Sequence, residues 1–216
     1  MAKIRPFELY TQDYERWFER KRPLYLSEVQ LLKNLIKEIT FKKALEVGIG
    51  TGRFALPLGI QYGIDPSEAM LEVARQKGLK VVKGIAESLP VKSSSVDLVL
   101  MVTTICFVDD PIKTLKEVER VLTPDGYFLI GFVDRGSFLG KLYEEKKEKS
   151  PFYGIADFYS TNGVIELVEK HTSLRLVRSG QTLFGTENIL YPVKEGYGEG
   201  GFVGLLFKRD KAQSLD

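Results

Sequence analysis

The segment at residues 46–52, EVGIGTG, follows an apolar run and places glycines at three alternate positions, Gly48, Gly50 and Gly52. Glycine lets a ligand approach the backbone closely, and glycine-rich turns after a strand hold nucleotides at the carboxyl ends of parallel strands. The spacing differs from the G-x-G-x-x-G pattern of NAD-binding proteins, because Arg53 stands where the third glycine would be. No P-loop lysine follows, which argues against an ATPase. The segment therefore predicts a nucleotide site of another type.

Apolar runs and helix-like segments alternate at short intervals around this loop, which predicts a parallel sheet wrapped by helices. We expect strands at residues 43–47, 60–64, 79–83, 96–102 and 127–133, the last after a TPDG turn. We expect helices at residues 66–77, 112–122 and 161–170, and two N-terminal helices within residues 8–39 separated by Pro23. Two final strands, at residues 174–184 and 201–208, have no helix between them and predict an antiparallel hairpin at one edge of the sheet.

Composition narrows the classes of protein and site. The 216 residues include 31 basic and 29 acidic ones, a net charge of +2, so no strong attraction to nucleic acid or an anionic membrane is expected. No apolar signal-peptide segment or membrane-spanning run is present, which predicts a cytoplasmic protein. Cys106 and His171 are each the single residue of their type, so we expect no disulfide and no metal site. Asn and Gln together number only nine, which suggests a thermophilic source.

Asp65 ends the second predicted strand, in YGIDPSEAM. An acid at this position can accept hydrogen bonds from both hydroxyl groups of a ribose. The alternative is a helix start, with Asp65 as the N-cap, Pro66 in the first turn and Glu68 three residues on. The glycine loop upstream favours ribose binding.

Four segments in this order resemble the class I S-adenosylmethionine-dependent methyltransferases: LEVGIGTGRF, YGIDPSEAMLEVAR, GIAESLPVKSSSVDLVL and LKEVERVLTPDGYFLIG. The resemblance covers residues 42–134 and is strongest to the type 11, ubiquinone/menaquinone-methyltransferase-like subgroup. It implies a Rossmann-like fold with a mostly parallel seven-stranded sheet, helices on both faces and the antiparallel edge hairpin. It also implies one methyltransferase domain over residues 1–216, with a helical cap (1–40), a cofactor-binding core (41–134) and a substrate-side region (135–216).

The resemblance implies S-adenosylmethionine as cofactor, with S-adenosylhomocysteine as product. The cofactor-binding residues that it implies are Glu46, Gly48, Ile49, Gly50, Gly52, Asp65, Pro66, Ala86, Glu87, Met101 and Val102. Two departures stand out. Ile85 replaces an aspartate common in the family, so adenine must be held otherwise, through Glu87 or a backbone carbonyl. The stretch at Cys106 lacks the histidines found in many relatives.

The predicted reaction is in-line methyl transfer to a small molecule, in which the protein mainly positions the two reactants. A base is required only where the acceptor must lose a proton, and no catalytic residue is assigned. Candidate acceptor-site residues are Tyr14, Trp17, Thr103, Thr104 and Tyr197. Methylation of RNA or protein, or cofactor binding without catalysis, are the alternatives. No nucleic acid or membrane partner is expected, and the oligomeric state is left open.

Other polar residues have simpler explanations. Cys106 is expected to be a small buried residue rather than a nucleophile. Asp110 is expected to begin a helix before Pro111, and His171 to end one. Glu117 and Arg120 fit an ion pair within one helix.

Overall fold

The computed structural model describes residues 3–210 and forms one eight-stranded sheet in the order β3-β2-β1-β4-β5-β8-β6-β7. The strands are β1 (Ala44–Val47), β2 (Tyr62–Asp65), β3 (Lys80–Lys83), β4 (Val96–Val102), β5 (Leu122–Val133), β6 (Leu174–Thr182), β7 (Lys194–Glu195) and β8 (Phe202–Arg209). Strands β1 to β5 are parallel, whereas β8 pairs antiparallel with both β5 and β6. The predicted fold class and edge hairpin are therefore confirmed. The eighth strand is the two-residue β7, which pairs with β6 inside a segment expected to be a loop.

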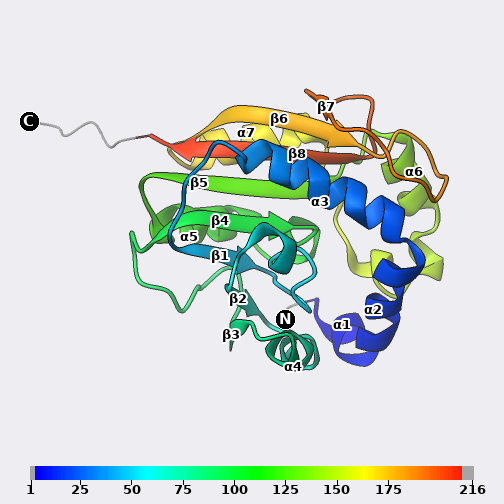
Figure 1. Ribbon diagram of the computed structural model, residues 1–216, viewed down its shortest axis with the longest axis horizontal. Coiled ribbons are helices and arrows are strands. Elements are labelled where there is room, and N and C mark those ends of the chain that lie inside the picture. The colour runs from blue at the N-terminus through cyan, green and yellow to red at the C-terminus, as the bar shows by residue number, and fades with distance from the viewer. Residues whose placement is uncertain (1–2, 211–216) are drawn as a thin grey trace, which may run out of the picture.

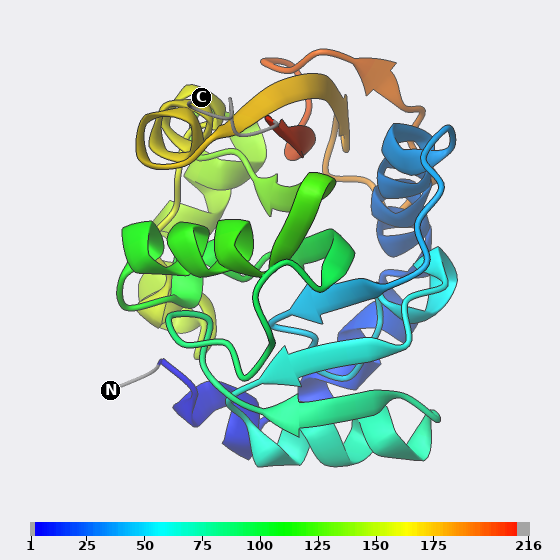
Figure 2. The same cartoon turned by 90° about the vertical axis from the view of Figure 1, so that its left-hand side faces the viewer.

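Helices cover both faces of the sheet (Figures 1 and 2). They are α1 (Arg5–Leu9), α2 (Thr11–Arg20), α3 (Arg22–Ile36), α4 (Glu68–Gln76), α5 (Pro111–Val121), α6 (Phe138–Glu145) and α7 (Thr161–His171). One apolar core lies between the sheet and α3, around Leu31, Leu32 and Leu35, and the other lies under α5 and α7. A sheet covered on both faces explains why residues 98–102 of β4 and 127–133 of β5 form nearly continuous apolar runs rather than alternating.

The boundaries of two predicted regions differ from expectation. The N-terminal region contains three helices rather than two, with Pro23 in the first turn of α3 as its fixed φ favours. Strand β5 begins at Leu122, so the TPDG segment lies within the strand. Asp125 has a φ of 66°, and the pairing of β4 with β5 shifts register between Val96 and Leu98. The turn residues thus form an irregularity in the strand instead of preceding it.

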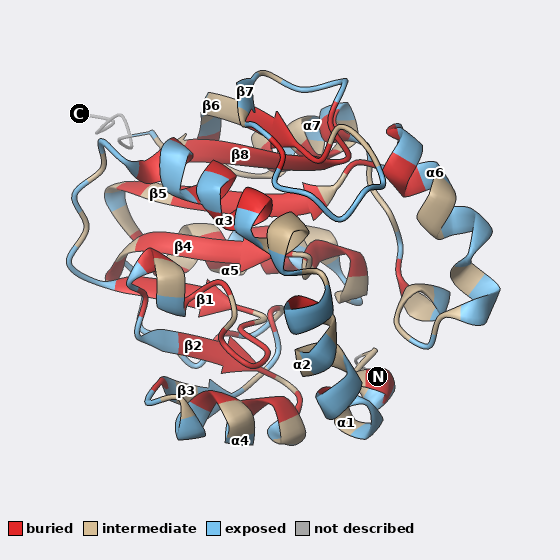
Figure 3. Cartoon of the chain, turned by 45° about the vertical axis from the view of Figure 1, so that its right-hand side comes forward, coloured by how far each residue is buried: buried red, intermediate tan, exposed pale blue. Residues whose placement is uncertain are grey.

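The strand order reverses between β1 and β4, and the carboxyl ends of parallel strands at such a point form a crevice that binds ligands. Helices α1, α2 and α6 lie beyond the arrowheads of β4 and β5, and their outer faces are exposed while the central strands are buried (Figure 3). Among residues 3–210, no helix is both long and apolar enough to cross a membrane.

Candidate functional site

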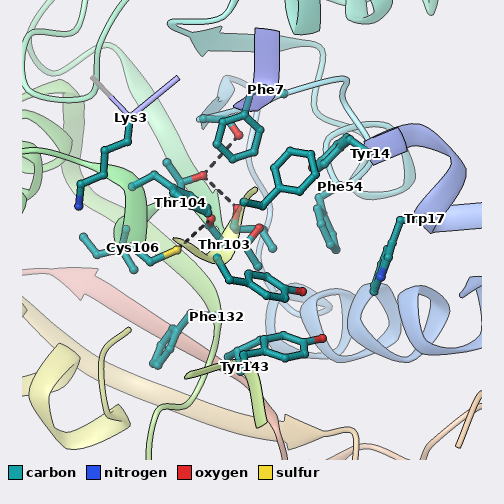
Figure 4. A pocket seen from close by; sticks show the side chains of 18 of the residues that line it. Lys3, Phe7, Tyr14, Trp17, Phe54, Thr103, Thr104, Cys106, Phe132 and Tyr143 are labelled. Atoms are coloured by element: carbon teal, nitrogen blue, oxygen red, sulfur yellow. Dashed lines mark hydrogen bonds between the residues drawn. The ribbon is translucent and has the colours of Figure 1, made fainter. Parts of the chain in front are cut away.

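A cavity of about 920 Å³ lies at the carboxyl ends of the parallel strands. Its floor includes Val47, Asp65 and Val102, which end or nearly end β1, β2 and β4. Side chains from α1 and α2 form one wall, and side chains from residues 132–159 form another. In Figure 4, Tyr14, Phe54 and Trp17 surround one side of the space and Phe132 and Tyr143 the other.

The glycine loop follows β1 and has left-handed backbone at three positions, with φ of 73° at Gly48, 52° at Gly50 and 80° at Gly52. The Gly48 amide donates a hydrogen bond to the Ile64 carbonyl at 2.8 Å, which fixes the loop against β2. A Cβ atom on Gly48 would lie 2.2 Å from Oγ1 of Thr104, so this position has no space for a side chain. The loop is followed by a single 3₁₀ turn, Leu56–Leu58, rather than by a long helix as in dinucleotide-binding folds.

Asp65 faces the glycine loop across the cavity floor. Its Oδ2 accepts a hydrogen bond from the Gly50 amide at 2.8 Å, and its Oδ1 accepts one from the Ser67 amide at 2.9 Å. Burial raises the pKa of Asp65 to about 6, although these two hydrogen bonds oppose the shift. The N-cap of α4 is Ser67, whose hydroxyl accepts from the Met70 amide, so the alternative of Asp65 as N-cap is wrong. Two carboxylate oxygens, each with one donor, retain lone pairs for a ligand.

Glu46 lies in β1 beneath the loop and is 1% exposed. Burial raises the pKa of Glu46 well above its ordinary value, with a further contribution from Asp65, while a hydrogen bond from the Ala55 amide opposes the shift. Its Oε2 has no hydrogen-bond partner among residues 3–210. A buried oxygen without a partner costs free energy unless a bound group or a water satisfies it.

Glu15 of α2 connects the wall formed by α1 and α2 to the glycine loop and its surroundings. Its carboxylate accepts from Nε and Nη2 of Arg53 at 2.9 and 2.6 Å, from Nζ of Lys77 at 2.8 Å, and from the Thr51 hydroxyl. Burial alone would raise the pKa of Glu15, but the hydrogen bonds from Arg53, Lys77 and Thr51 outweigh it and lower the pKa. The glycine loop and α2 are therefore held together by charge-assisted hydrogen bonds.

Most of the residues suggested by sequence line this cavity. They are Tyr14, Trp17, Gly48, Gly50, Asp65, Pro66, Ala86, Glu87, Val102, Thr103 and Thr104. Ile85 lines it as well and is 42% exposed. Glu87 also accepts a hydrogen bond from the Asp109 amide at 2.7 Å, so one of its oxygens stabilises the segment before α5.

Five suggested residues are not part of the lining. Glu46, Ile49 and Gly52 are buried around the loop, with Ile49 packed where a side chain on Gly63 would be. Met101 is fully buried in the core under α5, because alternate side chains of a strand point to opposite faces. Tyr197 is 41% exposed in the segment after β7 and lies outside the lining.

Cys106 in the cavity and four polar residues outside its lining have structural roles that agree with expectation. Cys106 donates to the Thr103 carbonyl, and burial raises the pKa of its thiol to about 12, which leaves it a poor nucleophile. Asp110 caps α5 by accepting from the Lys113 amide at 2.9 Å. Arg120 and Glu117 form the expected ion pair, and His171 ends α7.

The sequence analysis placed residues 135–216 on the substrate side but named none of the aromatic residues of this wall that line the cavity, and it did not identify the buried acid Glu28 of α3. Tyr143 of α6 and Tyr153 stack with ring centroids 4.3 Å apart, and Phe158 packs beside them. Glu28 of α3 also lines the cavity and is 6% exposed. The available signal for Glu28 was its place on a helical stripe that otherwise consists of leucines, at positions 24, 31, 32 and 35.

Comparison with known proteins indicates which reaction a cavity of this kind supports. Residues 45–130 match the model of a family described as a methyltransferase domain. The chain is 47% identical to a Thermotoga maritima protein of known structure, with a TM-score of 0.92, covering 96% of this chain and all of that one. That protein is described as a "SAM-dependent methyltransferase, possible histamine N-methyltransferase".

Two relatives extend the comparison. An uncharacterized Methanocaldococcus jannaschii protein is 42% identical over 201 residues, which are 92% of this chain and 96% of the relative. Demethylmenaquinone methyltransferase of Staphylococcus aureus is 37% identical over 109 residues, which cover 44% of this chain and 45% of the enzyme. The last match is thus partial, whereas the first two extend over nearly whole chains.

Proposed function

Since the chain belongs to the class I S-adenosylmethionine-dependent methyltransferases, and its cofactor is S-adenosylmethionine, we propose that it methylates a small molecule held inside the cavity. The observation that supports this most is the cavity itself. Its volume of about 920 Å³ lies at the upper end of the range of about 300–1,000 Å³ typical of small-molecule sites. That volume suits a cofactor together with a compact acceptor.

The residues at the floor of the cavity fit the cofactor. The glycine loop offers backbone without side chains, and Asp65 keeps lone pairs free for hydroxyl groups of a ribose. We assign Gly48, Gly50 and Asp65 to binding of the cofactor, with Pro66, Ala86 and Glu87 beside its base and Val102 below it. Glu46 supports the loop from beneath, and its unpartnered oxygen suits a donor such as an ammonium group. When bound, the cofactor supplies a methyl group on a positively charged sulfur.

The cap (residues 1–40) and the region at residues 135–216 supply the remaining walls in this proposal. Phe7 of α1 packs against Phe107 and Phe152, with ring centroids 4.9 and 5.2 Å apart. Lys3 also pairs with Asp157. The contacts of Phe7 with Phe152 and of Lys3 with Asp157 join the two regions across the cavity. They favour an acceptor small enough to be enclosed over a strand of RNA or a protein surface.

The Thermotoga maritima relative supports the same class, because histamine, the acceptor suggested in its description, is a small molecule. The chain's own residues then position the acceptor and exclude water. Aromatic side chains such as Trp17, Phe132 and Tyr143 provide apolar walls for this purpose. A dry, closed site favours methyl transfer over reaction with water.

The experiment uses cofactor with a radiolabelled methyl group and the full chain. A cell extract is separated into a small-molecule filtrate, a protein fraction and an RNA fraction, and each is tested as acceptor. We expect label in the small-molecule fraction, and none with a Gly48→Ala variant, whose loop cannot keep its conformation. Label confined to RNA or protein would overturn the proposal.

A further inference from the structure

We propose that the acceptor is a cationic amine, and that the Glu28 carboxylate binds its ammonium group and takes up one of its protons. This inference rests on the proposed function, since it concerns the acceptor end of the same cavity. Glu28 lies in the middle of α3, is 6% exposed and lines the cavity. Its neighbours on the same face of α3 are leucines that pack into the core, so its position is fixed by well-packed surroundings.

No cation within residues 3–210 forms an ion pair with this acid. Among residues 3–210, Glu28 takes part in no ion pair and accepts no hydrogen bond, unlike Glu15, Glu87 and Glu117, which all have donors. Four basic residues also line the cavity, and none perturbs the pKa of Glu28. Arg20, Lys21 and Lys146 are exposed or half-buried, and half-buried Lys3 pairs with Asp157. An isolated buried carboxylate is costly, so its presence in a cavity indicates a positively charged or proton-donating ligand.

Four phenols lie within electrostatic range of Glu28. Burial raises the pKa of Tyr14 of α2, Tyr25 of α3, Tyr143 of α6 and Tyr153, and a negative charge on Glu28 contributes to each shift. Burial is the sole cause that raises the pKa of Glu28 itself, to about 8. At neutral pH the empty site therefore holds the proton on Glu28, and an arriving ammonium ion favours the carboxylate form by direct attraction.

The aromatic side chains near Glu28 complete a site for such a cation. Tyr143, Tyr153 and Phe158 form a cluster on the wall contributed by residues 138–159, and all three line the cavity. Aromatic faces attract ammonium ions, and more strongly where water is excluded. A carboxylate set among aromatic rings thus selects a charged nitrogen on a compact organic skeleton over a neutral hydroxyl or thiol.

The proton transfer is simple. An N–H bond of the ammonium breaks, its electron pair stays on nitrogen, and the proton passes to a carboxylate oxygen of Glu28. Nitrogen then has the lone pair that methyl transfer requires. An acid whose pKa is near neutrality is suited to accept this proton, whereas an ordinary exposed glutamate would return it too readily.

The test measures binding to the full chain saturated with S-adenosylhomocysteine. Three amine and alcohol pairs of matched shape serve as probes: 2-phenylethylamine with 2-phenylethanol, butylamine with butanol, and cyclohexylmethylamine with cyclohexylmethanol. Wild type is compared with Glu28→Gln and with Asp13→Asn, a control that also converts a cavity-lining acid into its amide. We expect wild type and the control to bind at least one amine about tenfold more tightly than its alcohol, and Glu28→Gln to show no preference.

A second measurement does not depend on any variant. Calorimetry of wild type in two buffers of different ionisation enthalpy near pH 7 should show that amine binding releases protons, as binding converts Glu28 to its carboxylate form. Absence of proton release, no amine preference in wild type, or a preference that survives in Glu28→Gln would each overturn the inference. Label transfer to phenols or thiols only would also overturn it while leaving the small-molecule proposal intact, whereas label confined to RNA or protein would remove both.

Discussion

The two ends of the cavity are built in different ways. In our proposal the cofactor end is formed mainly by one short stretch, residues 46–65, and depends on backbone conformation and on the carboxylate of Asp65. Pro66, Ala86, Glu87 and Val102 complete it from the segments that follow. The acceptor end is formed by side chains from α2, α3, α6 and the turn at Tyr153, which are far apart in the sequence. The first end follows from local rules of chain geometry, while the second requires the folded arrangement of distant segments. The comparison predicts that substitutions at the two ends affect different measured quantities.

The largest effect is expected from Gly48→Ala. A Cβ atom there would lie 2.2 Å from Thr104 Oγ1 and 2.8 Å from its Cβ, and the residue would keep a φ of 73°. The left-handed conformation alone costs about 1–2 kcal/mol for a residue with a side chain. We expect S-adenosylhomocysteine binding to fall by about a hundredfold or more, because the loop must shift. Isothermal titration calorimetry measures this change.

Gly59→Ala is the matched control. Gly59 has almost the same φ, 74°, but a Cβ atom there would meet nothing within 4 Å. It should lose a similar amount of stability from backbone strain and keep its affinity for S-adenosylhomocysteine. Equal losses of affinity in both variants would mean that strain, rather than the space around the loop, determines binding.

At the cofactor end, a smaller change in affinity for S-adenosylhomocysteine is expected when the pH is lowered or when Asp65 is replaced in Asp65→Asn. The pKa of Asp65 is raised to about 6, so below this pH the empty site carries a protonated acid that must lose its proton to accept from ribose hydroxyls. Affinity for S-adenosylhomocysteine should therefore fall about tenfold between pH 7 and pH 5. In Asp65→Asn it should be weaker at pH 7 by about 2 kcal/mol and should lose this pH dependence.

The carboxyl group of Asp65 also affects folding stability. This contribution falls as the pH rises, whereas the affinity for S-adenosylhomocysteine increases. A raised pKa in the folded state means that its contribution is fully present below about pH 4 and is lost as the pH rises through about 6. The negative charge of Glu8 contributes to the shift at Asp65, and buried Glu46 lies close by with a raised pKa of its own. The difference between wild type and Asp65→Asn is therefore the informative quantity. An affinity that is flat with pH in wild type would assign Asp65 to holding Gly50 and Ser67 alone.

The sequence was sufficient for the parts of the fold that depend on local pattern. Strand β4 has the predicted bounds, α7 begins at the predicted residue, and the glycine loop and Asp65 face one another. The two-residue β7 was not predicted, because so short an edge strand has no periodicity of its own. The TPDG segment was predicted as a turn, since its residues favour turns and the pairing that keeps it in β5 is tertiary.

The candidate site could likewise be predicted from the sequence only where it depends on local pattern. Met101 was assigned to the cavity from its place near the end of β4, but the alternation of side chains directs it into the opposite core. Tyr197 was chosen for its chemistry, and the path of the chain after β7 takes it elsewhere. Glu28 and the stacked pair Tyr143 and Tyr153 line the same cavity only because the fold brings α3 and α6 around it. No local sequence pattern specifies that these three residues line one cavity.

The smallest effect is expected from Cys106→Ala, which tests whether the acceptor end contains a nucleophile. Cys106 lines the cavity, but burial raises the pKa of its thiol to about 12, and the thiolate is the reactive form. Native wild type should therefore resist alkylation by iodoacetamide at neutral pH, as followed by mass spectrometry, and react after unfolding. Cys106→Ala should keep its affinity for S-adenosylhomocysteine and most of its methyl transfer. Rapid alkylation of the native protein, together with loss of transfer in the variant, would place a reactive thiolate at the acceptor end and require a chemistry other than direct displacement by the acceptor.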